Sequence, residues 1–92
     1  MLTAIVMIDV EPDAIPEVAE QCAALEYVSA VYSVTGDFDL IAIIRVPEHG
    51  LLAEVITGKL SKLPGIRATQ THLAFREYSS RDLEAAFDIG LE

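Results

Sequence analysis

Two aspartates that flank a phenylalanine are the residues of this sequence best placed to do chemistry. Asp37 and Asp39 stand in the stretch Gly36-Asp37-Phe38-Asp39, between two runs that read as buried strand. In one interpretation the stretch is only a turn, in which Gly36 supplies a positive φ and the carboxylates accept hydrogen bonds from turn amides. In the other interpretation, exposed backbone amides of the turn bind the carboxylate of a ligand, and Asp37 or Asp39 binds the ammonium group of the same ligand. The second arrangement would recognise a zwitterion.

The remaining reactive side chains indicate no catalytic or metal site. Cys22 is the lone cysteine and falls on the apolar stripe of an expected helix, so we expect it in the core. A single cysteine forms no disulfide framework and no cysteine-based zinc site, which suits a reducing, cytoplasmic compartment. His49 and His72 lie far apart, without partners at metal-ligand spacing. No nucleophile–base set or phosphate loop is present, so we expect no enzyme activity, cofactor or metal.

The charge of the chain excludes one class of partner. The 15 Asp and Glu residues outnumber the 6 Lys and Arg residues, and the net charge is −9. Such a chain repels a phosphate backbone, so direct nucleic-acid binding is not expected. No segment is long enough to span a membrane, and the apolar residues 1–10 lack the basic lead of a signal peptide.

The elements that position these residues fall into two similar halves, each a strand-rich run followed by a helical pattern. Residues 2–10 alternate as a strand whose second face is also half apolar. Asp13 is expected to cap a helix over residues 15–25, with Pro16 in its first turn. Strands over residues 27–35 and 39–46 are then expected to pair antiparallel across the short Gly36-Asp37-Phe38 link.

The second half repeats this order. A helix is expected from residues 47–50 to Leu63, despite Gly58 in its interior, and Pro64-Gly65 stops it. Residues 66–76 read as a fourth strand, and Ser79-Ser80 opens a short last helix. The order β-α-β-β-α-β predicts an α+β, ferredoxin-like fold, with a four-stranded antiparallel sheet, two helices on one face and a short C-terminal helix. Residues 1–92 are expected to form one domain.

Two helices can cover only one face of this sheet. The other face carries apolar residues whose identity depends on the strand register: Ile5, Met7, Ile41 or Ile43, and Leu73 or Phe75. Burying such a face contributes roughly 25 cal/mol per Å², whereas water is a poor neighbour for it. The sequence therefore predicts a homodimer in which the sheets of two copies stack.

Three short motifs follow one another at fixed spacing. They are Gly-Asp-Phe-Asp at residues 36–39, Lys-Leu-Pro-Gly-Ile at 62–66 and Thr-Gln-Thr at 69–71. Together they resemble the ligand-binding domain, or RAM domain, of the leucine-responsive and asparagine-type (Lrp/AsnC, feast/famine) transcriptional regulators, in which Gly-Asp-Tyr-Asp, Leu-Pro-Gly-Val and Thr-x-Thr occur in this order. The resemblance covers nearly the whole chain.

The resemblance implies a dimeric α+β barrel, with dimers arranged into an octamer or a similar ring. It also implies small effectors, often amino acids, bound between dimers. The effector site would take residues from the turn and from the last strand: Gly36, Asp37, Phe38, Asp39, Thr69, Gln70 and Thr71. For the last three residues the alternative is an ordinary polar strand face, which we favour for Gln70.

One part of full-length family members is absent from this sequence. They carry an N-terminal helix-turn-helix domain that reads DNA, whereas Met1 here begins at the first strand of the sensor domain. We interpret residues 1–92 as a stand-alone ligand-binding domain without a DNA-binding domain, and a shortened form of a longer regulator is the other interpretation. A stand-alone sensor would act on transcription by co-assembly with full-length Lrp/AsnC relatives.

Three classes of function remain open at this point. We favour a non-enzymatic module that binds an effector, forms rings and alters the oligomeric state of DNA-binding relatives. The second class is a small monooxygenase-like enzyme on the related dimeric α+β barrel, in which His72 would face a cavity between helices and sheet. The third is an oligomerisation module without a ligand.

Overall fold

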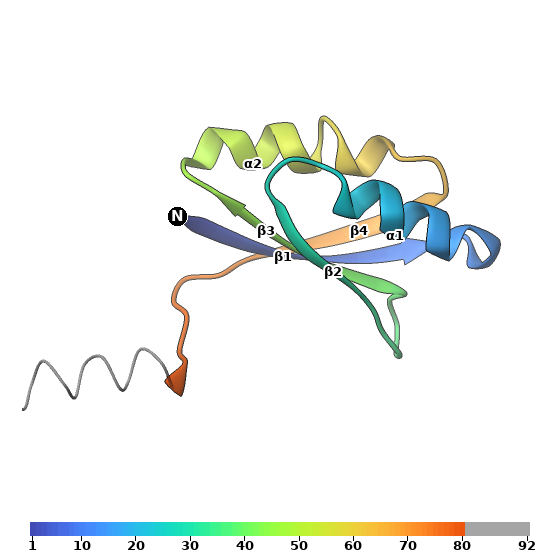
Figure 1. The fold of residues 1–92 in the computed structure, drawn as a ribbon, viewed down its shortest axis with the longest axis horizontal. Coiled ribbons are helices and arrows are strands. Elements are labelled where there is room, and N and C mark those ends of the chain that lie inside the picture. Colours follow the sequence, from blue (N-terminus) through green and yellow to red (C-terminus); the bar gives the residue numbers. More distant parts are fainter. Residues whose placement is uncertain (81–92) are drawn as a thin grey trace, which may run out of the picture.

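A computed structural model describes residues 1–80 and shows a four-stranded antiparallel sheet with two helices on one face (Figure 1). The elements are β1 (Leu2–Val10), α1 (Ile15–Ala23), β2 (Val28–Ser33), β3 (Leu40–Val46), α2 (His49–Ile56) and β4 (Ile66–Leu73). The strands lie in the order β2-β3-β1-β4. This arrangement is the predicted ferredoxin-like α+β fold. The predicted C-terminal helix lies outside the described residues.

Strict alternation along the two central strands separates the two faces of the sheet. The even-numbered residues of β1 from Ala4 to Val10 are buried beneath the helices, and so are the even-numbered residues of β3. Ile5 pairs with Ile43, and Met7 pairs with Ile41, on the other face. The bounds of β1 match the prediction because its apolar residues alternate over the whole strand.

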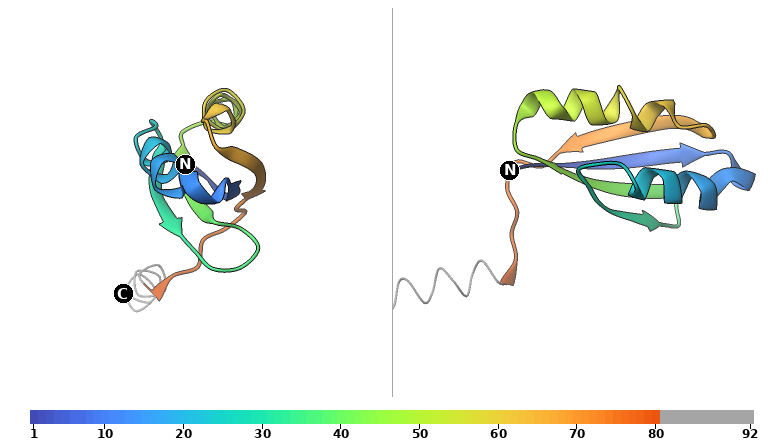
Figure 2. Two further views of the ribbon diagram at one scale, coloured as in Figure 1. Left: turned by 90° about the vertical axis from the view of Figure 1, so that its right-hand side faces the viewer. Right: turned by 45° about the horizontal axis from the view of Figure 1, so that its top comes forward.

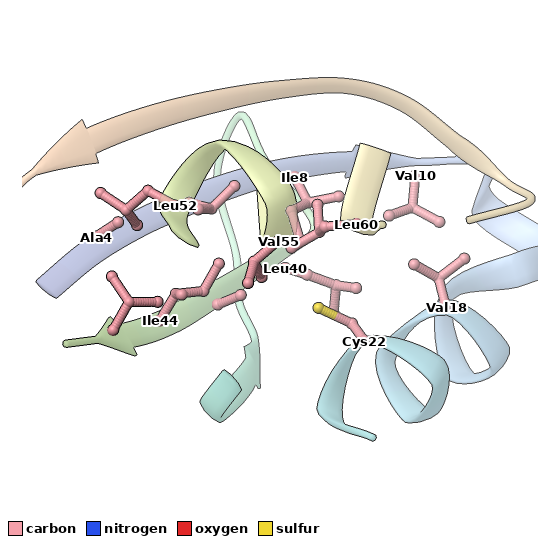
Figure 3. Packing of buried hydrophobic residues seen from close by; sticks show 13 residues of the cluster. Ala4, Ile8, Val10, Val18, Cys22, Leu40, Ile44, Leu52, Val55 and Leu60 are labelled. Atoms are coloured by element: carbon pink, nitrogen blue, oxygen red, sulfur yellow. The ribbon is translucent and has the colours of Figure 1, made fainter. Parts of the chain in front are cut away.

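The core fills the space between the sheet and the helices (Figure 3). Val18 and Cys22 of α1, Leu52 and Val55 of α2, and Leu60 after α2 pack on the buried residues of the central strands. Among the described residues, none that is buried is polar or charged. The interior is therefore a dry apolar layer that holds the sheet in shape and offers no polar groups for chemistry.

The prediction that Asp13 caps the first helix is wrong. A 3₁₀ turn over Pro12–Ala14 precedes α1, and no side chain caps the helix, whose N-cap residue is Ala14. The amide of Glu11 donates to the Gly65 carbonyl at 2.8 Å, and the amide of Ala14 donates to the Glu11 carbonyl at 2.9 Å. These bonds place Asp13 inside the turn. Pro16 lies in the first turn of α1, as predicted.

The second helix is shorter than predicted, because α2 ends at Ile56 and not at Leu63. The amides of Thr57 and Gly58 both donate to the Ala53 carbonyl, at 2.9 and 3.2 Å, which closes the helix end. A Cβ atom at Gly58 would lie 2.5 Å from the backbone oxygen of Glu54. The glycine therefore permits the chain to leave the helix here, and a 3₁₀ turn over Leu60–Lys62 follows.

The fourth strand also ends early, at Leu73, where Arg76 was predicted. The amide of Ala74 donates to the Thr3 carbonyl at 2.9 Å, and β1 begins only one residue before Thr3, so no further strand partner remains. The chain then leaves the sheet on the side opposite the helices, as the two views of Figure 2 show.

The face of the sheet opposite the helices, called the open face below, carries Ile5, Met7, Ile41 and Ile43. Ile41 and Ile43 of β3 both lie there because they occupy alternate positions of one strand. Leu73 does not, because it pairs with Ala4 and so shares the face of the helices. Phe75 lies beyond β4, in the segment that leaves the sheet.

Candidate functional site

The Gly36–Asp39 turn joins β2 to β3 at one end of the sheet. Gly36 has φ +110°, the conformation predicted for it. The amide of Val34 donates to the Asp39 carbonyl at 3.0 Å and closes the hairpin. Asp37 is exposed, whereas Phe38 is half-buried. The turn thus presents one free carboxylate beside a glycine that forces a left-handed bend.

Both the side chain and the backbone of Asp39 form hydrogen bonds with the end of β1. Its Oδ2 atom accepts a hydrogen bond from the Val10 amide at 2.9 Å, and its own amide donates to the Ile8 carbonyl at 3.0 Å. The bond is available because β3 pairs with β1 only as far as Ile8, so no β3 carbonyl reaches Val10. The carboxylate replaces that missing carbonyl. The amide that Asp39 binds therefore belongs to a strand and not to the turn.

The last-strand residues of the predicted site lie on two faces. Thr69 and Thr71 pair with Ile8 and Val6 and share the helix-covered face, whereas Gln70 pairs with Met7 on the open face. Ile8 has Leu40 on its other side. Thr69 is therefore two strand spacings, about 10 Å, from the start of β3 beside Asp39. The turn and Thr69 lie near one end of the sheet, whereas Thr71 lies beside the middle of β1 and Gln70 faces the opposite side of the sheet.

An ion pair near this end escaped the sequence analysis. Arg67 Nε lies 3.8 Å from Asp9 Oδ2. The β1–β4 ladder shifts between Asp9 and Val10, so Asp9 pairs with Ala68 and Val10 with Ile66, and Arg67 has no direct partner. A register shift of this kind leaves no signal in a single sequence.

The other reactive residues form no catalytic or metal-binding arrangement among residues 1–80. Burial in the core raises the pKa of the Cys22 thiol to about 11, which keeps the thiol protonated and unreactive. His72 pairs with Ile5 and so faces the open side of the sheet, not the space beneath the helices. Within residues 1–80, no group of three His, Cys, Asp or Glu side chains could hold a metal ion. No helix in this range is long and apolar enough to cross a membrane.

A family model confirms the class of protein that these features define. The model described as the Lrp/AsnC ligand binding domain matches residues 3–83. The chain belongs to this family of ligand-binding domains, whose members include transcriptional regulators.

Two curated relatives are longer than this chain. An uncharacterized HTH-type transcriptional regulator of Pyrococcus furiosus is 35% identical over 72 residues, which are 78% of this chain and 49% of the relative. The HTH-type transcriptional regulator LrpA of Pyrococcus abyssi is 32% identical over 65 residues, 71% of this chain and 46% of LrpA. The chain thus spans about half the length of the curated relatives it matches.

Some solved structures that share the fold are matched over nearly their whole length, and others over only about half of it. A Thermus thermophilus protein superposes with a TM-score of 0.81 at 39% identity, over 86% of this chain and 99% of that one. AsnC of E. coli gives a TM-score of 0.79 at 16% identity, over 85% of this chain and 53% of AsnC. A Neisseria meningitidis transcriptional regulator in complex with L-Met gives 0.77 at 16%, over 85% and 52%. The last two likenesses show the fold alone.

Proposed function

We propose that this chain is a non-enzymatic effector-binding and oligomerisation module of the Lrp/AsnC type. The observation that carries the proposal is the difference between the two aspartates of the Gly36–Asp39 turn. Asp39 is hydrogen-bonded to Val10, whereas Asp37 is exposed and has no ion-pair partner among residues 1–80. A free carboxylate on a turn held in place by its neighbour is suited to receive a ligand ammonium group. Its place in a ligand-binding domain family supports this role.

The proposed effector is an amino acid. The fold neighbour from Neisseria meningitidis forms a complex with L-Met, which supports this ligand class. Asp37 would receive the ammonium group, and backbone amides of the turn around Gly36 and Phe38 would hold the carboxylate. Thr69 and Thr71 would complete the pocket where two dimers adjoin. Gln70 would take part only through the open face on which it lies.

The proposed assembly begins with a homodimer formed by two open faces. Ile5, Met7, Ile41 and Ile43 are only half-buried in a single chain, and stacking two sheets removes these side chains from water. Dimers would then form an octamer or a similar ring. Because the curated relatives are HTH-type regulators that this chain matches over only about half of their length, co-assembly with such relatives in the cytoplasm would connect effector binding to transcription.

The structure gives no support to the enzyme alternative. A monooxygenase-like barrel needs His72 to face a cavity between helices and sheet, but His72 pairs with Ile5 on the open face. The space beneath the helices is filled by the apolar core (Figure 3).

Size-exclusion chromatography with light scattering tests the proposal, repeated with each of the twenty amino acids and combined with melting curves. We expect a dimer or a larger ring, and at least one amino acid that raises Tm through preferential binding to the folded state. Asp37→Asn should abolish the rise without changing the unliganded Tm. Glu20→Gln, an exposed carboxylate on α1, is the matched control and should keep the response.

Two outcomes would contradict different parts of the proposal. An assembly whose Tm is the same with all twenty amino acids would leave only the oligomerisation module. A folded monomer at micromolar concentration would overturn the assembly as well.

A further inference from the structure

The open face is hollowed at the end away from the Gly36–Asp39 turn. The hollow has a volume of about 650 Å³. Ile5 of β1 and Ile43 of β3 line it from the sheet, and Phe75 lines it from the segment that follows β4. None of the seven residues of the candidate effector site contributes to the lining. The hollow is therefore separate from the candidate effector site.

Two aromatic side chains at this hollow are exposed in the part of the chain that the structure describes. Phe75 is 101% exposed and Tyr32 is 57% exposed, and both line the hollow. A phenylalanine with no neighbour leaves its whole ring in water, and exposed apolar patches of this kind mark interaction sites. Aromatic residues are also the side chains most enriched at the centres of protein interfaces.

The charge around the hollow favours contact with another copy of the chain. Arg45, Arg76 and Glu77 line the hollow, and Arg45 Nη2 lies 4.0 Å from Glu77 Oε2, so the lining side chains have a net charge of +1 with Arg76 outside the ion pair. The whole chain carries −9. Two copies of so acidic a chain repel each other least where such a surface lies between them.

We infer that the hollow receives Phe75 of a second copy of this chain, whose own hollow receives Phe75 in return. A two-fold interface uses the same patch on both subunits, so a protruding ring and a concavity within one patch complement each other. The volume of about 650 Å³ lies in the range of cavities that enclose drug-sized molecules, which leaves room for an aromatic ring. The inference rests on the proposed self-association and adds the residue that anchors it.

A tryptophan at position 75 tests the inference directly, because the chain contains no tryptophan. Phe75→Trp places a single fluorophore on an exposed site and should not disturb folding. Its emission should have the wavelength of a buried indole at concentrations where light scattering shows a dimer, and should shift to the red on dilution. Tyr78→Trp is the matched control, because Tyr78 is 82% exposed on the same segment but does not line the hollow.

Truncation of the ring gives a second measurement. Phe75→Ala should raise the dimer dissociation constant by about tenfold or more, the effect of losing an interface anchor, whereas Tyr78→Ala should change it less than about twofold. A dimer of the Phe75→Trp variant whose fluorophore emits as an exposed indole would overturn the inference but not the proposed dimer. So would a dimer whose affinity Phe75→Ala leaves unchanged. A monomeric wild-type chain would overturn both.

Discussion

At the scale of single residues, the two aspartates of the turn have different environments although only Phe38 separates them. Asp39 accepts a hydrogen bond from Val10, a residue 29 positions earlier, whereas Asp37 remains exposed. The motif therefore combines a structural carboxylate with a free one. The sequence predicted the turn and its glycine, because both depend on local preferences, but the partner of Asp39 depends on where β3 stops pairing with β1.

The bond between Asp39 and Val10 makes a prediction for stability. Asp39→Ala leaves the amide of the buried residue Val10 without its acceptor and should lower the free energy of unfolding by about 1–2 kcal/mol. Asp39→Asn keeps an acceptor oxygen and should cost less than half as much, because only the charge assistance is lost. Urea denaturation of the two variants measures the difference. Equal losses would show that the charge, and not the hydrogen bond, stabilises the turn.

Cys22 makes a prediction for the pH dependence of stability. Burial raises the pKa of its thiol from 9.0 to about 11. The folded state holds this proton more tightly than the unfolded chain, so the thiol's contribution is complete below about pH 9 and is lost as pH rises to about 11. The loss should reach about 2–3 kcal/mol, at 1.36 kcal/mol per pKa unit.

The matched variant for this measurement is Cys22→Ala, because lysines and tyrosines titrate over the same pH range. Urea denaturation of both proteins at about pH 8 and about pH 10.5, on either side of the unperturbed thiol pKa, separates the thiol from those groups. The wild-type free energy of unfolding should fall further than that of the variant. Parallel decreases would show that Cys22 ionises as easily in the folded state as in the unfolded chain.

At the scale of elements, the hydrophobic patterns of the sequence predicted the strand faces and the order of helices and strands. Tertiary contacts decided where individual helices and strands end. Alternation fixed the faces of β1, and the element order fixed the sheet, so the fold followed from the sequence. The same alternation places Gln70 on the opposite face of β4 from Thr69 and Thr71. Element ends were missed where tertiary contacts set them, as at the 3₁₀ turn that contains Asp13 and at Gly58 after α2.

The loops before β3 and before β4 make a prediction that compares two glycines. Both have positive φ, +110° at Gly36 and +97° at Gly65, so alanine at either site should cost about 1–2 kcal/mol of backbone strain. A Cβ atom at Gly36 would meet nothing within 4 Å, whereas at Gly65 it would lie 2.9 Å from Ala14 Cβ and 3.0 Å from Val18 Cγ2. Gly65→Ala should therefore destabilise the chain more than Gly36→Ala by about 1 kcal/mol or more, because overpacking adds to the strain.

Melting curves of Gly36→Ala and Gly65→Ala, recorded with and without amino acids, measure these losses and also report on the candidate site. Gly36→Ala changes the turn that carries Asp37, so it should weaken an amino-acid response more than its small loss of stability explains. Gly65→Ala should lower Tm but keep the response of the remaining folded protein. A larger loss of stability at Gly36 than at Gly65 would contradict the packing argument.

At the scale of the whole molecule, the turn and the hollow occupy opposite ends of the sheet, and β1 connects them. Ile5 near its start lines the hollow, and Val10 at its end binds Asp39. The central strand is buried on one face and paired on both edges, so it provides a rigid connection between the two regions. The proposed effector turn and the proposed contact at the hollow therefore share no lining residue.

The uneven charge of the molecule makes a prediction for its assembly in salt. The chain carries −9, while the side chains that line the hollow carry a net +1 from Arg45, Arg76 and Glu77. Long-range repulsion between copies acts over a Debye length of about 30 Å at 0.01 M salt and about 8 Å at 0.15 M. The dimer dissociation constant should therefore decrease as salt rises over this range, as measured by analytical ultracentrifugation.

A charge reversal on the contact surface sharpens this measurement. Arg76→Glu should weaken the dimer and steepen the dependence on salt, because it replaces one of the few positive charges at the hollow with another negative one. A dissociation constant that increases with salt in the wild-type chain would show that attraction across the interface outweighs the repulsion of the acidic chains.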